Sequence, residues 1–225
     1  MIRYILIDID NTLLDFHKCS DASIRQGFAE FGFPYGPETF PAFITINDRL
    51  WGNIEQGKLT REGLKKVRWA MIFAQLGIEG DGEAFEQRYV ELLTESCETV
   101  DGAEDLLRYL AGKYPVYGAS NATYAQQDHR LTLAGLRHYL RDIFASREIG
   151  AMKPNPDFFR HCLNKLGNPP KEEVLLIGDS LTADMQGGID SGIRTCWFNY
   201  QGLPHSAAPA VDFIADRLCD IPKYI

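Results

Sequence analysis

The sequence of 225 residues has few cysteines, and none of them forms a metal-binding or redox motif. They are odd in number and scattered, without a C-x-x-C pair, and the five histidines show no metal-ligand spacing. Free thiols in a reducing compartment are the expectation for this pattern. The lone cysteines are Cys19, Cys97, Cys162, Cys196 and Cys219.

Long apolar runs are also missing. No stretch approaches the ~18 consecutive apolar residues that a membrane-spanning helix needs, so we expect no membrane partner. The N-terminus enters a strand-like pattern at once, without the basic region and apolar segment of a signal peptide. The sequence therefore predicts a cytoplasmic protein.

Positive charge is scarce as well. The 23 Lys and Arg residues are outnumbered by 31 Asp and Glu residues, which gives a formal charge of −8. Grooves that follow a nucleic acid need clustered Lys and Arg, so a nucleic acid polymer is not an expected partner. A small anionic substrate is compatible with this charge where local cations outweigh the overall field.

What is present is the composition of an ordinary globular protein, 45% hydrophobic and 24% charged. Short apolar runs alternate with helical patterns, which predicts an α/β fold with a Rossmann-like parallel sheet. The expected strands are 3–9, 114–119, 142–146, 173–178 and 193–198. The expected helices of this sheet are 102–112, 122–134, 156–166 and 182–191.

Residues 17–98 show a different pattern, with no convincing strand and several helical stretches such as 60–76. Glycines interrupt these stretches, as expected between helices. We therefore expect a core domain built from residues 1–16 and 99–225, with an inserted helical cap over 17–98.

Polar side chains follow the expected strands at their carboxyl ends. The first strand runs into "ILIDIDNTLL", which places two carboxylates one residue apart after a buried run. Ligands of open parallel sheets bind beyond the carboxyl ends of the strands. The residues at these ends, which we expect to converge on one crevice, are Asp8, Asp10, Ser120, Asn121, Lys153, Asp179 and Asp184.

Buried carboxylates that lie close together need a cation. At ~4 Å and an effective dielectric near 20, two like charges repel by about 4 kcal/mol. Asp8 and Asp179 are therefore not both ionised in close contact without one. Carboxylates without His or Cys suit a hard, oxygen-binding ion, and Mg²⁺ is the expected cofactor.

The same residues suit phosphoryl transfer, in which catalysis is mostly alignment and charge stabilisation. The Asp8 carboxylate can attack phosphorus and form an aspartyl-phosphate. Lys153 and Ser120 can contact the other phosphate oxygens. Asp10 can protonate the leaving alcohol and then activate a water molecule.

These motifs resemble those of the haloacid dehalogenase superfamily, in order and at fitting intervals. They are Asp8-x-Asp10-x-Thr12, Ser120-Asn121, Lys153-Pro154 and Gly178-Asp179-Ser180-x-x-x-Asp184. The resemblance covers nearly the whole chain, and the helical insertion lies where that superfamily often has a cap. One departure is Ala122, at a position where the superfamily usually has glycine.

The resemblance implies a role for each motif residue. It implies Asp8 as nucleophile and Asp10 as acid and base. It also implies a phosphate-binding set, in which Thr12 supports the loop, and the set comprises Thr12, Ser120, Asn121 and Lys153. It also implies Mg²⁺ held by Asp8, Asp179 and the backbone carbonyl of Asp10, with Asp184 steadying the water shell of the metal.

A narrower similarity concerns the substrate. The runs "DNTLLDF", "KPNPDFF" and "GGIDSGIRTCWFN" resemble bacterial house-cleaning pyrimidine 5′-nucleotidases of the superfamily. That resemblance implies a phosphatase of nucleoside 5′-monophosphates, with a small phosphorylated metabolite as partner. The alternatives are a sugar-phosphate phosphatase, a phosphoglycolate phosphatase or a phosphomutase, and, from another class, a non-catalytic phosphate-binding regulatory module.

A nucleotide-binding P-loop is a competing interpretation of residues 52–59, "GNIEQGKL". Leu59 stands where a P-loop needs Ser or Thr for the metal, and a helical segment precedes the run instead of a strand. Gly57 is better explained as the end of a helix.

A serine-hydrolase elbow is a competing interpretation of residues 118–122, "GASNA". Ala122 replaces the final glycine of that motif, and His205, in an expected loop, would have to serve as the base. This interpretation also leaves Asp8, Asp10 and Lys153 without a role.

Several aromatic residues and one arginine of the cap lie at helical spacing. Such residues usually form a core. Arg68 is the residue that we select as a possible substrate contact from the cap.

Overall fold

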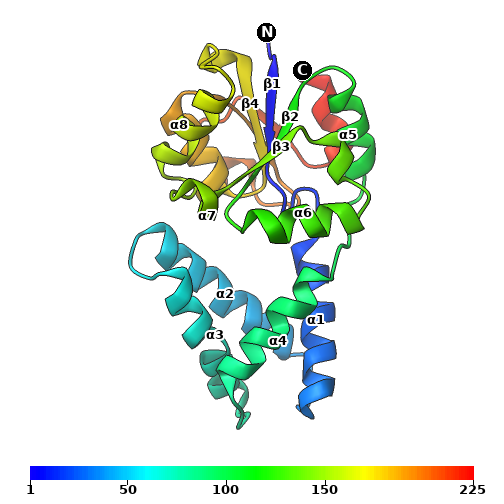
Figure 1. The fold of residues 1–225 in the computed structure, drawn as a ribbon, viewed down its shortest axis with the longest axis vertical. Coiled ribbons are helices and arrows are strands. Elements are labelled where there is room, and N and C mark those ends of the chain that lie inside the picture. The colour runs from blue at the N-terminus through cyan, green and yellow to red at the C-terminus, as the bar shows by residue number, and fades with distance from the viewer. The chain divides into compact units, whose positions relative to one another are not determined.

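The computed structural model describes residues 1–225 as two compact units (Figure 1). The core unit comprises Met1–Phe16 and Cys97–Ile225, and the helical unit comprises His17–Ser96. We expected the chain to return from the helical unit to the core unit between residues 98 and 99. In the structure this boundary lies between residues 96 and 97.

The core unit contains one parallel sheet of six strands in the order β3-β2-β1-β4-β5-β6. The expected α/β class with a Rossmann-like parallel sheet is confirmed. The strands are β1 (Tyr4–Ile7), β2 (Val116–Ser120), β3 (Asp142–Ala145), β4 (Val174–Gly178), β5 (Arg194–Phe198) and β6 (Phe213–Ala215). The sequence did not predict β6, which lies at one edge of the sheet.

Helices cover both faces of this sheet, as Figure 1 shows for α5 and α8 on opposite sides of the strands. Ile5 and Ile7 point to the face covered by α5 (Ala103–Ala111) and α6 (Tyr124–Leu133). Leu6 and Leu176 point to the face covered by α8 (Pro156–Lys165). Both faces of the central strands are therefore buried, which explains why those strands are continuous apolar runs.

The remaining elements of the core unit are short. They are α7 (Ser146–Ile149), α9 (Gly187–Ser191), the π-helix η3 (Leu181–Gln186), and the 3₁₀-helices η1 (Arg137–Tyr139), η2 (Lys171–Glu173), η4 (His205–Ala207) and η5 (Leu218–Lys223). The helix expected over 182–191 is thus a π-helix followed by a short α-helix. A π-turn often marks a functional site, and η3 contains the predicted site residue Asp184.

The helical unit contains four helices: α1 (Phe16–Phe31, whose first residue belongs to the core unit), α2 (Thr39–Glu55), α3 (Arg61–Leu76) and α4 (Gly82–Thr94). The side chains of Thr60 and Asp81 cap the N-termini of α3 and α4. Trp69 is fully buried and packs edge-on against Phe85 with ring centroids 4.3 Å apart. Aromatic rings therefore form the core of this unit.

Two further findings concern the helices and the cysteines. None of the helices combines the length and the apolarity that crossing a membrane requires. All five cysteines are free thiols.

Candidate active site

Three neighbouring strands bring the predicted residues to one edge of the sheet. In the strand order, β1 lies between β2 and β4, and all three are parallel. Asp8 follows β1, Ser120 ends β2, and Asp179 follows β4. Because parallel strands end at the same edge, these side chains meet there although they are far apart in the sequence.

A cluster of carboxylates forms at this edge. One oxygen from each of Asp8, Asp179 and Asp184 lies within 4.8 Å of the others. The ammonium group of Lys153 donates hydrogen bonds to Asp8 Oδ1 at 2.7 Å, Asp184 Oδ1 at 2.6 Å and the carbonyl oxygen of Ala119 at 2.6 Å. Lys153 is only 2% exposed, so its charge is offset by buried carboxylates instead of by water.

The electrostatics of the cluster follow from burial and proximity. Burial raises the pKa of Asp8 to about 7, although the Lys153 ammonium lowers it, and the carboxylate of Asp184 adds to the rise. Burial also raises the pKa of Asp179 well above its usual range, helped by Asp8 and Asp184. Burial alone would lower the pKa of Lys153, but the carboxylates of Asp184 and Asp8 raise it. Without a further cation, the cluster therefore retains protons near neutral pH.

Local structure holds the carboxylates in place. Thr12 is fully buried, and its hydroxyl donates to Asp8 Oδ2 at 3.1 Å. On the other side, Asp184 Oδ2 accepts from the backbone N–H of Ser180 at 3.2 Å. A Cβ atom on Gly178 would lie 2.4 Å from that same oxygen of Asp184, so the strand end needs glycine at this position. Thr12 thus supports Asp8, in line with the expected support of this loop, and its place in a phosphate-binding set stays a prediction.

The amide of Asn121 is used to hold the lysine segment. Its Nδ2 donates to the carbonyl oxygen of Lys153 at 2.9 Å, and its Oδ1 accepts from the backbone N–H of Lys153 at 2.8 Å. We expected Asn121 to bind phosphate. These two bonds fix the backbone that carries the Lys153 ammonium, and the expected contact of Asn121 with phosphate stays a prediction.

Asp10 lies apart from the carboxylate cluster. Its Oδ1 accepts from Arg130 Nη1 at 2.6 Å, and its Oδ2 accepts from Gln127 Nε2 at 2.5 Å. Sequence reasoning did not select Gln127 or Arg130. The one pattern that could have identified them is their spacing of three residues, which puts both on one face of the helix after Ser120 and Asn121. Only the strand order shows that this face lies beside Asp10.

The two competing motifs take ordinary structural roles. Residue 57 of the P-loop-like run has a φ of 70°, and its N–H bonds to Ile54 just after α2 ends, as expected for a helix terminator. In the elbow-like run, the hydroxyl oxygen of Ser120 accepts from Ala122 N–H and Gln127 Nε2. His205 pairs with Asp216 instead.

Arg68 is an interior residue of the helical unit. Its guanidinium donates to both carboxylate oxygens of Glu86, at 2.7 and 3.0 Å, and to Asn47 Oδ1 at 2.9 Å. It also lies over the ring of Tyr89, 4.9 Å from the centroid. The geometry thus favours a packing role for Arg68 over the substrate contact that the sequence suggested.

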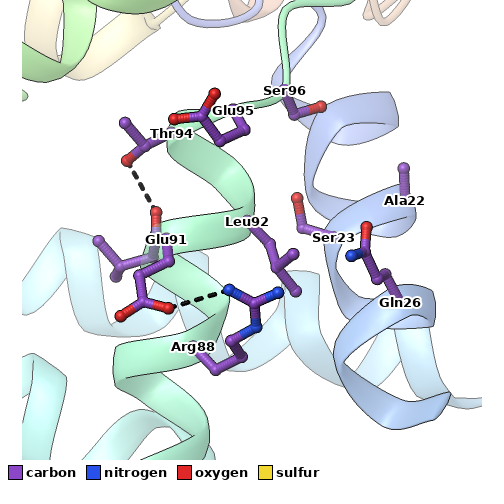
Figure 2. Close-up of a pocket in the computed structure, with 10 residues that line it drawn as sticks. Ala22, Ser23, Gln26, Arg88, Glu91, Leu92, Thr94, Glu95 and Ser96 are labelled. Carbon is purple, nitrogen blue, oxygen red and sulfur yellow. Dashed lines mark hydrogen bonds and ion pairs between the residues drawn. The ribbon is translucent and has the colours of Figure 1, made fainter. Parts of the chain in front are cut away.

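A cleft of about 730 Å³ lies within the helical unit, between α1 and α4 (Figure 2). Its main charged group, Arg88, donates to Glu30 and Glu91. Gln26 also donates to Glu30, and the Ser23 hydroxyl donates to the carbonyl of Cys19, so these polar groups have structural partners. The cleft is therefore not the candidate active site.

Comparison with known proteins places this arrangement in a family. A model of the haloacid dehalogenase-like hydrolases matches residues 2–192. The chain belongs to this family, and it is a hydrolase. The HAD-hydrolase YfnB of Bacillus subtilis is 35% identical over 203 residues, which cover 90% of this chain and 86% of YfnB.

Two further relatives of this hydrolase have names that state a substrate class. The pyrimidine 5′-nucleotidase PynA of Streptococcus pneumoniae is 35% identical, with 88% of this chain and 84% of PynA covered. The pyrimidine 5′-nucleotidase YjjG of Escherichia coli is 30% identical, with 92% of this chain and 91% of YjjG covered. The structure is also similar to the magnesium-bound crystal structure of YfnB, with a TM-score of 0.92, 32% identity, and 99% and 97% of the two chains covered.

The donor set fits a hard divalent cation. Asp8, Asp179 and Asp184 offer only carboxylate oxygens, which are the ligands that Mg²⁺ prefers. The pKa values of Asp8 and Asp179 are raised because their ionised forms are unfavourable here, and a bound cation would stabilise those forms. Asp8 and Asp184 both accept a hydrogen bond from Lys153, at 2.7 and 2.6 Å, so a cation at this cluster would share these two carboxylates with the ammonium.

We predict that Arg68→Ala lowers the free energy of unfolding by about 3–5 kcal/mol, because it leaves the buried carboxylate of Glu86 unpaired. The double variant Arg68→Met/Glu86→Leu should recover most of this loss. Urea denaturation of the single and double variants measures both effects. A double variant with restored stability but a greatly raised KM would show that Arg68 contacts substrate after all.

Proposed function

We propose that this hydrolase is a Mg²⁺-dependent phosphatase of small phosphomonoesters, and that nucleoside 5′-monophosphates are its substrates. The observation that carries the proposal is the separation of two carboxylates. Asp8 lies in the cation-binding cluster, whereas Asp10, two residues later, is held outside it by Arg130 and Gln127. One carboxylate is thus placed as nucleophile and the other as acid and base.

In the proposed reaction, a carboxylate oxygen of Asp8 attacks phosphorus, and the bond from phosphorus to the ester oxygen breaks. Asp10 gives its proton to the departing alcohol. Asp10 then takes a proton from water, which attacks the aspartyl-phosphate and releases inorganic phosphate with Asp8 restored. The Ser120 hydroxyl and the Lys153 ammonium are the proposed contacts of the phosphate oxygens. Lys153 would exchange one of its three present hydrogen bonds, to Asp8, Asp184 or the Ala119 carbonyl, for a phosphate oxygen.

A bound Mg²⁺ would offset the negative charge of the phosphate and of Asp8. The carboxylates of Asp8 and Asp179 and the backbone carbonyl of Asp10 are the proposed ligands. Asp184 supports the site from behind, because its carboxylate holds Lys153 and the backbone of Ser180. The crystal structure of the similar YfnB is bound to magnesium, which supports Mg²⁺ as the cation.

The substrate class follows from the relatives. PynA and YjjG, both named as pyrimidine 5′-nucleotidases, cover most of this chain at 35% and 30% identity. Sugar phosphates and phosphoglycolate are the second class, because the proposed roles of the core residues concern the phosphate group that all these esters share. A cytoplasmic location and a small phosphorylated metabolite as the partner belong to the same proposal.

The test is a release assay for inorganic phosphate, with Mg²⁺ and a panel of nucleoside 5′-monophosphates, sugar phosphates and phosphoglycolate. We expect the highest kcat/KM on pyrimidine nucleoside 5′-monophosphates. Highest activity on a sugar phosphate or on phosphoglycolate would assign the second class. Phosphate binding without turnover on the whole panel would favour a regulatory module.

We predict that Asp8→Asn has no detectable turnover while its fold stays intact, because an amide is a poor nucleophile. Circular dichroism and thermal unfolding check the fold, and phosphate release checks the activity. Asp105→Asn is the matched control, since Asp105 is a surface carboxylate, 82% exposed, on α5, where it pairs with Arg108. Turnover of Asp8→Asn near that of the control would contradict an aspartyl-phosphate intermediate.

We predict that Mg²⁺ stabilises the protein more at about pH 8 than at about pH 5.5, because protons compete with the cation for Asp8 and Asp179. The pKa of Asp8 rises from 3.8 to about 7 on folding. The folded protein therefore binds the extra proton between these values, and without a cation this group makes the protein less stable as pH rises through that window. Mg²⁺ should restore the loss.

Thermal unfolding with Mg²⁺ and with a chelator at both pH values measures this effect. Asp179→Asn should show a smaller Mg²⁺-induced rise in Tm than the wild type at the higher pH, whereas Asp105→Asn should match the wild type. An equal Mg²⁺ effect at both pH values would argue against these carboxylates as ligands.

A further inference from the structure

Helix α6 presents two polar side chains to the active site from inside the protein. Gln127 and Arg130 are one helical turn apart, so they share one face of α6. Both are buried, with exposed fractions of 0% and 1%. Together they donate to both oxygens of Asp10, Arg130 at 2.6 Å and Gln127 at 2.5 Å.

The burial of Arg130 indicates more than a packing role. Replacing a buried ion pair by apolar residues of similar volume is often neutral or stabilising, so such a pair is weak evidence for stability. Asp10 keeps 30% of its side chain exposed, so water alone could solvate this carboxylate. A buried arginine that reaches a partly exposed carboxylate therefore fixes its direction, which water would leave free.

Gln127 also determines which way the Ser120 hydroxyl points. Its amide group donates to Asp10 Oδ2 and, at 3.0 Å, to Ser120 Oγ. Ser120 Oγ accepts a second hydrogen bond from the Ala122 N–H at 3.1 Å. With two donors on its oxygen, the hydroxyl keeps its own hydrogen to donate elsewhere.

The other end of the Gln127 amide supports this orientation. Its Oε1 is buried and has no hydrogen-bond partner. A buried unpaired carbonyl is unfavourable. Turning the amide over would be worse, because its oxygen would then face the carboxylate oxygen of Asp10, and the two acceptors would repel each other. The need to donate to Asp10 and Ser120 therefore decides the orientation.

We propose that Gln127 and Arg130 are positioning residues that hold Asp10 outside the cation cluster and keep the Ser120 hydroxyl turned to donate to phosphate. This proposal rests on the proposed function. Arg130 fixes the group that gives a proton to the leaving alcohol. Gln127 links that group to the phosphate-binding hydroxyl, so one helix sets both contacts.

The experiment compares two leaving groups in the first turnover. A nucleoside 5′-monophosphate releases an alkoxide that needs a proton, whereas p-nitrophenyl phosphate releases a stable phenolate that does not. Arg130→Met should slow ester cleavage of the nucleotide by roughly 10- to 100-fold, while p-nitrophenyl phosphate should lose only about two- to threefold. The KM of the nucleotide should stay close to the wild-type value.

Further variants separate the two residues. Arg130→Lys should recover part of the rate, because it keeps a positive charge near Asp10. Gln127→Met should slow nucleotide cleavage selectively as well and, unlike Arg130→Met, should also weaken inhibition by inorganic phosphate. Ala125→Gln, at an exposed position of α6, is the matched control and should behave as the wild type.

The outcomes are distinct. Equal losses on both substrates, or faster cleavage in Arg130→Met, would overturn the positioning role. If Arg130→Met does not fold, the selectivity of Gln127→Met decides the same question. Wild-type protein without any phosphatase activity would instead refute the proposed function, whereas an active wild type whose variants keep its substrate ratio refutes only this inference.

Discussion

The active site depends on one buried ammonium group. Lys153 lies between Asp8 and Asp184, within 2.7 Å of both, at the edge where the central strands end. Without this charge, the carboxylates of the cluster would repel one another in a place where water cannot screen them. The two hydrogen bonds from Asn121 to the backbone of Lys153 fix where the charge lies. The position of the lysine thus determines the spacing of the acids.

The two faces of the sheet supply different cations to different carboxylates. The segment that leads into α8, on one face, carries Lys153 to Asp8. Helix α6, on the other face, carries Arg130 to Asp10. Asp8 and Asp10 are only two residues apart, so this arrangement separates their environments across a very short distance. Two acids of the same type can then take different roles in one reaction.

The sequence predicted the sheet and the members of the carboxylate cluster because their signals are local. Buried parallel strands are continuous apolar runs, and Asp8, Asp179 and Lys153 belong to short motifs beside them. Other features depend on contacts between distant segments. The side chain of Asn121 binds the backbone of Lys153, and Arg68 pairs with Glu86 on another helix. Strand β6 is too short for its pattern to stand out.

The helical unit leaves the core unit and returns to it at neighbouring points. Leu14 pairs with Thr99 in an antiparallel bridge, and the N–H of Asp15 donates to the carbonyl of Glu98 at 2.8 Å. Both contacts lie within the core unit, so the core unit itself holds the two ends of the inserted segment next to each other. Because of this closure, an insertion of another length could begin and end at the same two points and leave the register of the strands unchanged.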